Sequence, residues 1–201
     1  MKTIGTIEEL RARYAAPKRT SMEKVARDIT PVYAAWIARS RFCVLSTVGP
    51  EGTDASPRGD DGPVVRIVDA RHLLMPDWYG NNRLDSLENI VEDGRVSLMF
   101  FVPGSRNVVR VNGHGTLVVD DALLESFAHR GKPPATVLSV EVAEVYFQCA
   151  RAILRSNLWS GRDESADLPS AGDMLAAMAA EAIEAREYDR AWAKEAPETL
   201  W

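Results

Sequence analysis

Apolar residues in the first forty positions recur every three or four residues, which predicts helices. A first helix is expected around residues 7–14, where the apolar positions are Ile7, Leu10 and Tyr14, and Pro17 should end it. A second helix is expected from about Ser21 to Arg39, with Ser21 as its N-terminal cap. Pro31 lies inside this second pattern and should kink or split the helix, because proline cannot donate a backbone hydrogen bond.

From residue 42 onward the pattern changes to short apolar runs separated by turn residues. The runs typical of strands are Phe42–Val48, Thr53–Ser56, Val64–Val68, His72–Met75, Val96–Val102, Val108–Val119 and Val137–Phe147. Only short helices, at 84–92 and 121–129, are expected between them, whereas a parallel sheet needs a crossover helix after nearly every strand. The predicted fold class is therefore mainly β with peripheral helices (α+β), built on an antiparallel barrel.

The last fifty residues return to a helical pattern. Residues 149–154 should continue out of the last strand as a helix, and Ser170–Lys194 is expected to form one amphipathic helix after a polar loop. Its apolar stripe needs a surface, which either this chain's barrel or a second subunit could supply. Without a repeat or linker, we expect a single domain of residues 1–201, with a helical region at 1–41, the barrel at 42–147 and helices at 148–201.

Charge and composition exclude several classes of partner. The formal net charge of -5 argues against a nucleic-acid binder, which needs clustered Lys and Arg. The sequence shows no apolar run long enough for a secretory signal or a membrane span, so we expect a cytoplasmic protein without a membrane partner. Cys43 and Cys149 both stand in apolar segments and are predicted to be buried, reduced thiols.

Common catalytic motifs are absent from the sequence. It has no nucleophile elbow, no phosphate-binding P-loop and no dinucleotide fingerprint. The three histidines have no metal-ligand spacing, so no metal centre is expected. His114 is predicted to be a solvated or hydrogen-bonded structural residue.

The turn Gly80–Leu87 carries the most particular chemistry. Asn82 would cap the helix that follows, and the free amides of that helix's first turn would attract an anion. Arg83 and Ser86 could reach the same anion, whereas Asp85 opposes it. On spacing alone, the turn fits a phosphate site and an ordinary capped helix equally well.

Several sequence blocks, in this order, resemble the pyridoxamine 5'-phosphate oxidase-like family of FMN-binding split barrels, in a branch of FMN-dependent enzymes distinct from its vitamin-making members. The resemblance covers roughly residues 42–159. The blocks that carry it are Ser56–Asp60, Arg66-Ile67-Val68, Asn81-Asn82-Arg83 with Ser86, Pro103–Ser105, Arg110–Gly113 and Cys149–Trp159.

The resemblance implies an antiparallel split β-barrel that binds FMN between the subunits of a homodimer. By that resemblance, Arg66, Asn82, Arg83 and Ser86 contact the phosphate, with Asn81 in the same turn, and Ile67 and Val68 contact the flavin through edge or backbone groups. A partner subunit would contribute the second group of cofactor-binding residues, which are Arg58, Arg110, Arg155 and Trp159. No catalytic side chain is assigned, because a flavin itself carries the redox chemistry.

The function expected from this resemblance is that of an FMN-dependent oxidoreductase acting on a small molecule, with NADH or NADPH as a candidate electron donor. Pyridoxal phosphate synthesis is not expected, because no histidine follows His129 and the chain ends Thr199-Leu200-Trp201 where those oxidases have Arg-Leu-x-Pro. The alternatives are a haem- or other ligand-binding split barrel without flavin turnover, a deazaflavin in place of FMN, and a purely structural dimerisation module.

Overall fold

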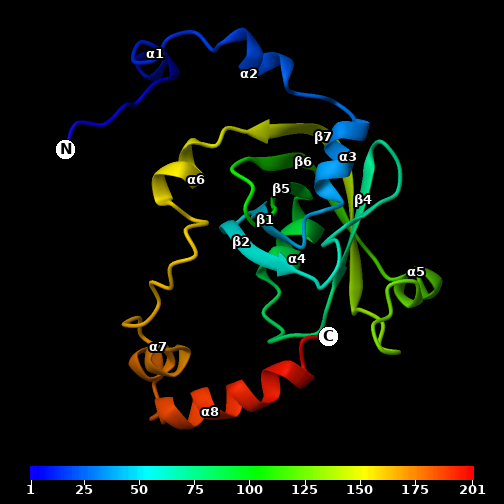
Figure 1. The fold of residues 1–201 in the computed structure, drawn as a ribbon, viewed down its shortest axis with the longest axis vertical. Coiled ribbons are helices and arrows are strands. Elements are labelled where there is room, and N and C mark those ends of the chain that lie inside the picture. The colour runs from blue at the N-terminus through cyan, green and yellow to red at the C-terminus, as the bar shows by residue number, and fades with distance from the viewer.

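The computed structural model describes residues 1–201, which form one antiparallel sheet of seven strands with helices around it (Figure 1). The order across the sheet is β2-β1-β5-β6-β7-β4-β3. The strands are β1 (Phe42–Gly49), β2 (Gly52–Gly59), β3 (Arg66–Ile67), β4 (His72–Asp77), β5 (Arg95–Phe101), β6 (Val108–Val118) and β7 (Thr136–Gln148). The predicted strands are all present, although the run expected at Val64–Val68 is a strand only at Arg66–Ile67.

The sheet curls into a barrel that is split between β2 and β4. A bulge between Asn112 and Gly113 breaks the register of the long β6–β7 pair, and bulges increase the local twist of a sheet. Only glycine is accommodated at position 113, because a Cβ there would lie 2.1 Å from the carbonyl oxygen of Glu141. β2 and β4 share no ladder, but Arg58 of β2 forms an ion pair with Asp77 of β4. The predicted split β-barrel is thus confirmed.

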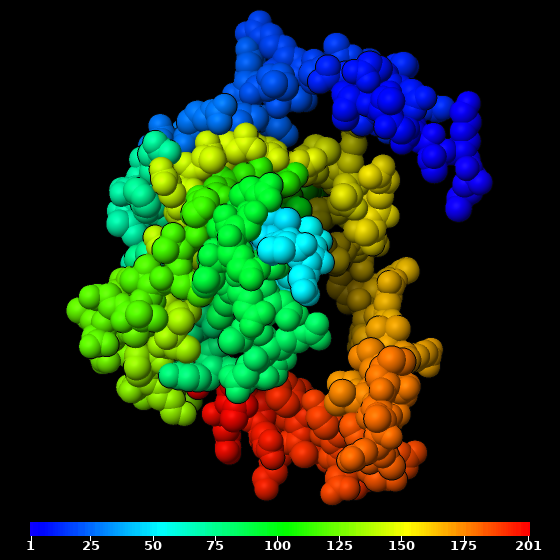
Figure 2. Space-filling model, turned by 180° about the vertical axis from the view of Figure 1, so that it is seen from behind, coloured from blue at the N-terminus to red at the C-terminus, as the bar shows by residue number.

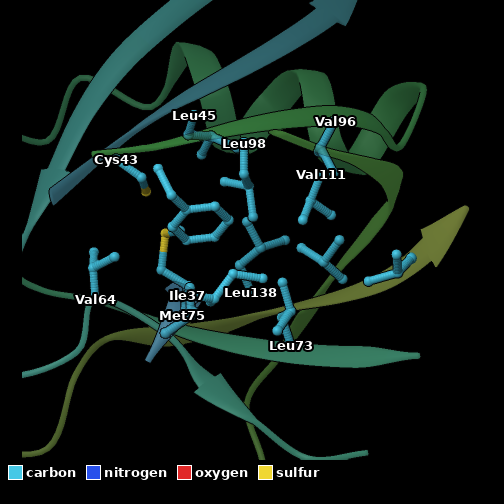
Figure 3. Packing of buried hydrophobic residues seen from close by; sticks show 14 of the residues in the cluster. Ile37, Cys43, Leu45, Val64, Leu73, Met75, Val96, Leu98, Val111 and Leu138 are labelled. Atoms are coloured by element: carbon cyan, nitrogen blue, oxygen red, sulfur yellow. The ribbon is translucent and has the colours of Figure 1, made fainter. Parts of the chain in front are cut away.

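Alternate residues of the strands fill the barrel with apolar side chains (Figure 3). Cys43 and Leu45 of β1 point inward together with Leu98 and Phe100 of β5, and all four are at most 1% exposed. This alternation is what an antiparallel strand with one buried face requires. Helices contribute to the same core through Ile37 and Ile90.

The helices are α1 (Ile7–Arg11), α2 (Arg19–Glu23), α3 (Pro31–Ile37), α4 (Asp85–Glu92), α5 (Asp121–Glu125), α6 (Arg151–Ser156), α7 (Ala171–Met178) and α8 (Ala185–Glu195), with a final 3₁₀ turn at Ala196–Glu198. None is both long enough and apolar enough to cross a bilayer.

The predicted helix from Ser21 to Arg39 is wrong for residues 24–30, which are not helical. β4 pairs with β7 only as far as Glu141 and leaves the edge of β7 open beyond it. Ala26 fills that edge with two backbone hydrogen bonds of 2.9 Å to Val145. Pro31 then begins α3 instead of kinking a longer helix, and Ser21 lies inside α2 instead of capping it.

The predicted helix Ser170–Lys194 is also wrong as a single element, because α7 and α8 are separate and pack on each other. Ser170 caps α7, and Gly172 allows close approach: a Cβ there would lie 2.2 Å from the carbonyl oxygen of Ala185. This tertiary contact prevails over the high helix propensity of the residues between the two helices. Their apolar stripe, including Leu175 and Ile183, is exposed in this chain.

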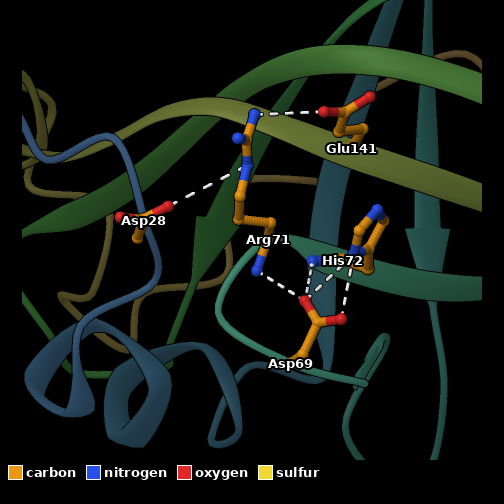
Figure 4. A network of polar contacts seen from close by, with 5 residues as sticks. All are labelled: Asp28, Asp69, Arg71, His72 and Glu141. Carbon is orange, nitrogen blue, oxygen red and sulfur yellow. Dashed lines mark hydrogen bonds and ion pairs between the residues drawn. The ribbon is translucent and has the colours of Figure 1, made fainter.

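A polar network fixes the turn between β3 and β4 (Figure 4). The Asp69 carboxylate accepts hydrogen bonds from the backbone N–H groups of Arg71 and His72, at 2.7 and 2.9 Å. The bond from the Arg71 N–H, followed by the hydrogen bond with the His72 ring, lowers the pKa of Asp69. The Arg71 guanidinium reaches Glu141 of β7 at 3.0 Å and Asp28 at 3.9 Å. The turn is thereby tied to both the barrel and the segment before α3.

The two cysteines differ in exposure, which corrects the prediction that both are buried. Cys43 lies in the core, whereas Cys149 is exposed after the end of β7. Burial raises the pKa of the Cys43 thiol from 9.0 to about 12, against a smaller opposing effect of Arg58.

We predict that a disulfide-based thiol reagent at about pH 8 modifies Cys149 and spares Cys43 in the native protein, since the thiolate is the reactive form. Mass spectrometry of the modified protein identifies the labelled cysteine. Equal rates of labelling at both cysteines of the native protein would contradict the placement of Cys43 in the core, and Cys149→Ser is the control that should abolish labelling of the native protein.

We also predict that the free energy of unfolding falls as pH rises from 9.0 to about 12, because unfolding returns the pKa of Cys43 to its ordinary 9.0.

We predict that Asp77→Ala lowers the free energy of unfolding by about 2 kcal/mol, because it leaves the Arg58 charge unpaired in a largely buried place. The two side chains are only 21% and 14% exposed. Denaturant unfolding of Arg58→Ala, Asp77→Ala and the double variant should show coupling. The double variant should lose less free energy of unfolding than the two single variants lose together. Glu23→Ala, which breaks the exposed pair with Arg19, should change stability by less than about 0.5 kcal/mol. If the losses of unfolding free energy from Arg58→Ala and Asp77→Ala simply add in the double variant, the two side chains do not stabilise the barrel as a pair across the split.

Candidate functional site

A pocket of about 800 Å³ opens beside the split in the barrel. Three elements form most of its wall, namely β2, the segment that follows β4, and α4. The lining residues are 54–58, 77–88, Val91, Glu92, Leu117, Ala135 and Thr136. The predicted turn Gly80–Leu87 therefore lies in the wall of a pocket large enough for a cofactor.

The turn before α4 is shaped by two asparagines. Asn82 has a left-handed backbone, with φ of 57°, which asparagine tolerates better than most residues. The side-chain oxygen of Asn81 accepts a hydrogen bond from the backbone N–H of Arg83 at 3.0 Å. The prediction that Asn82 caps α4 is wrong, because Leu84 occupies the cap position and no side chain caps the helix. The tight turn instead brings Arg83 into the pocket wall.

The donors expected to meet an anion are engaged by carboxylates in this chain. Arg83 Nε lies 2.6 Å from Asp85, and that hydrogen bond together with the charge of Asp85 raises the pKa of the guanidinium. The hydroxyl of Ser86, which is buried, donates to the Asp54 carboxylate on β2. Arg83 is 77% exposed and can exchange partners readily, whereas the Ser86–Asp54 contact joins α4 to β2.

Three polar atoms on residues that line this pocket are buried and have no hydrogen-bond partner: Arg58 Nε, Trp78 Nε1 and Thr136 Oγ1. Buried polar groups are nearly always satisfied in folded proteins. Trp78 and Thr136 flank the end of the β4–β7 ladder, in which Asp77 is paired with Thr136. Unmet donors at this place are the feature expected of a wall that completes its hydrogen bonds with a ligand.

Arg66 lines a second, smaller pocket of about 370 Å³, which shares Trp78 with the first. Its guanidinium donates to the Ser126 hydroxyl and carbonyl oxygens at 2.9 and 2.8 Å and lies 3.7 Å from the centre of the Phe127 ring. Burial raises the pKa of Asp60 in the same pocket. Arg66 and Arg83 thus line two different pockets, which share Trp78.

The other candidate residues of the sequence lie apart from both pockets, except Arg58. Ile67 packs against the core, and Val68 is exposed after β3. Arg110 on β6 lies over the Tyr146 ring at 5.4 Å, and Trp159 donates its indole N–H to the carbonyl oxygen of Ser105 at 2.7 Å. Arg155 is exposed on α6.

Sequence reasoning missed Trp78 and Thr136. Asp77-Trp78 follows the predicted strand His72–Met75 after a single proline, so a site at the end of that strand could have been suspected. Thr136 carries no local signal, because only the register of β4 against β7 brings it next to Asp77.

The pocket offers guanidinium groups, an indole and unsatisfied donors, which suits an anionic ligand with a planar aromatic part. No group of three His, Cys, Asp or Glu side chains is placed to hold a metal ion.

Comparisons with known proteins found solved structures that are similar to this chain at low sequence identity. Among solved structures, HupZ from Group A Streptococcus is 19% identical, with a TM-score of 0.47 over 58% of this chain and 91% of its own. An FMN-binding protein from Syntrophomonas wolfei is 16% identical, with a TM-score of 0.42 over 70% of this chain and 91% of its own. An FAD-binding protein from Mesorhizobium loti is 15% identical, with a TM-score of 0.42 over 61% and 94%. No curated protein sequence matches.

A sequence profile described as pyridoxamine 5'-phosphate oxidase matches residues 29–149, more than half of the chain. The matched residues contain every strand of the barrel, both arginines of the main pocket, and α4. This protein belongs to the pyridoxamine 5'-phosphate oxidase family.

Proposed function

We propose that this chain binds FMN in the main pocket and uses it to oxidise or reduce a small organic molecule, with a reduced nicotinamide as a candidate electron donor. The proposal rests on one observation. The Asn81–Arg83 turn lines the same pocket of about 800 Å³ as three residues with unsatisfied donors, which are Arg58, Trp78 and Thr136. When bound, FMN supplies the electron-transfer chemistry, so the protein needs no side-chain nucleophile.

The residues present fit the two ends of such a ligand. A phosphate suits Arg83, whose planar fork of donors can hold it in a bidentate manner, together with the polar turn at Asn81 and Asn82. A flavin ring carries several hydrogen-bond acceptors at its polar edge, which unmet donors such as Trp78 Nε1 and Thr136 Oγ1 could satisfy. Arg66 in the adjoining pocket is the alternative partner for the phosphate, since Trp78 lines both pockets.

Phosphate binding must displace a carboxylate. Asp85 holds Arg83 in this chain, and an incoming dianion would take its place at the guanidinium. The Arg83–Asp85 pair is exposed, so its loss costs little. Removing the charge of Asp85 should therefore favour the ligand, whereas removing Arg83 should disfavour it.

We also propose a homodimer in which the second copy completes the site. Arg110, Arg155 and Trp159 line neither pocket of their own chain. Arg155 is exposed, so a ligand held mainly by another copy can reach it.

We predict that Arg83→Ala weakens FMN binding about tenfold or more, because it removes a charge-assisted contact to the phosphate. Asp85→Asn should tighten binding, and Arg83→Lys should weaken it less than Arg83→Ala, since an ammonium group still pairs with phosphate but lacks the bidentate fork. Quenching of FMN fluorescence during titration measures all three. The matched control is Arg95→Ala, because Arg95 also forms an exposed 2.6 Å ion pair, with Asp93, but lies outside the pocket.

Equal weakening by Arg95→Ala and Arg83→Ala would contradict a phosphate site at the turn, and weakening by Arg66→Ala alone would move the phosphate to the adjoining pocket. A protein that does not bind FMN but gains a Soret band with haem would overturn the proposed cofactor.

For the redox function, anaerobic addition of NADH or NADPH should bleach the bound flavin. If the flavin stays oxidised with both NADH and NADPH, neither nicotinamide is its electron donor.

A further inference from the structure

Two arms extend from the barrel at opposite ends of the molecule (Figures 1 and 2). The N-terminal arm, residues 1–23, contains α1 and α2, and the C-terminal arm, residues 157–201, contains α7 and α8. Every residue of the N-terminal arm is exposed, and so are nearly all residues of the C-terminal arm. Figure 2 shows open space between the barrel and the orange part of the C-terminal arm, whereas the red end of the arm lies against the barrel.

Both arms present large apolar side chains to solvent. Tyr14 of the N-terminal arm is 73% exposed, and Met178 and Trp192 of the C-terminal arm are 83% and 56% exposed. Exposed apolar residues are ordinary when scattered singly, but here they recur along segments that little else in the chain covers. Such segments are typical of surfaces that a partner buries.

The arms carry opposite charge. Between Leu10 and Met22 the N-terminal arm has four basic residues and no acidic one. Between Asp163 and Asp189 the C-terminal arm has eight acidic residues and a single basic one. No ion pair joins the arms within the chain, and the four basic residues have only one ion pair among them, from Arg19 to Glu23 of the same helix.

We infer that the acidic C-terminal arm of one copy docks on the basic N-terminal arm of a second copy. A two-fold axis forms each such contact twice, because every copy then gives one arm and receives the other. Because the two arms lie at opposite ends of the chain, this closed pair requires the two copies to lie antiparallel and side by side. The inference rests on the proposed two-chain assembly, but not on flavin binding.

The acidic arm is already ordered for docking. Its helices are held by the Ser170–Asp173 capping box and by a 2.9 Å hydrogen bond from the Gly172 N–H to Asp189. The arm is tied to the barrel at both ends, through Trp159 and through Trp201, which stacks on His129 with a ring separation of 4.3 Å. Preorganisation lowers the entropic cost of binding, which favours a defined contact between copies.

Zero-length cross-linking tests the contact directly in the full-length protein. A carbodiimide joins lysine to carboxylate, so Lys18 should become linked to acidic residues of the C-terminal arm. In an equal mixture of ¹⁴N- and ¹⁵N-labelled protein, mass spectrometry should find these links between light and heavy chains. Links only within single chains, or none between the arms, would overturn the inference.

Charge reversal gives a second, independent readout. Arg11→Glu, Arg13→Glu and Lys18→Glu form one triple variant, and Asp167→Lys, Glu181→Lys and Glu184→Lys form the other. By sedimentation, each alone should dimerise about tenfold more weakly, and their mixture should recover the parental affinity. The control triple, Arg106→Glu, Arg130→Glu and Lys132→Glu, reverses exposed charges outside the arms and should leave the affinity unchanged.

The outcomes separate the arms from the assembly. Unchanged dimerisation of both triple variants would overturn docking of the arms and leave the two-chain assembly standing. A parental protein that stays monomeric at every concentration would overturn both, whereas the FMN titration would still report on the pocket.

Discussion

Arg58 and Asp77 form an ion pair across the split in the barrel, where no backbone ladder joins β2 to β4. A ladder would have fixed a whole row of residues, whereas a single side-chain pair fixes one point and leaves room for a pocket beside it. Trp78 follows Asp77 directly, so the same contact sets the position of the indole between the two pockets. The closure of the barrel and the shape of the proposed site therefore depend on one interaction. A pair so buried is costly to break, because either partner alone keeps an uncompensated charge.

The two ion pairs of the main pocket have different tasks because they differ in exposure. Arg58 and Asp77 are largely buried, and their pair is structural. The Arg83 side chain is 77% exposed beside Asp85, so the pair can open without leaving a buried charge. One guanidinium thus holds the wall together while the other is free to exchange a carboxylate for a ligand's anion.

The strands were predictable because turn residues and alternation are local signals, and the turn before α4 was found for the same reason. The failures came from contacts between distant segments. The spacing of apolar residues predicts a helix over residues 24–30, but Ala26 in this segment pairs with the open edge of β7. Similarly, the close approach of Gly172 to Ala185 keeps α7 and α8 apart as two helices. Thr136 enters the pocket only through strand register, and the separation of Arg66 from Arg83 depends on how the loop after β4 folds around Trp78.

If the wall containing Trp78 receives a flavin, as we propose, the indole N–H signals of the protein will report the contact. The chain has five tryptophans, so ¹⁵N-indole labelling gives five resonances, and Trp78→Phe identifies the relevant one. Addition of FMN should shift the Trp78 signal, since its Nε1 lacks a partner in the free chain, and should leave that of Trp36, which packs on the core, unchanged. A Trp78 resonance that stays in place at saturating FMN would show that no flavin lies against this wall.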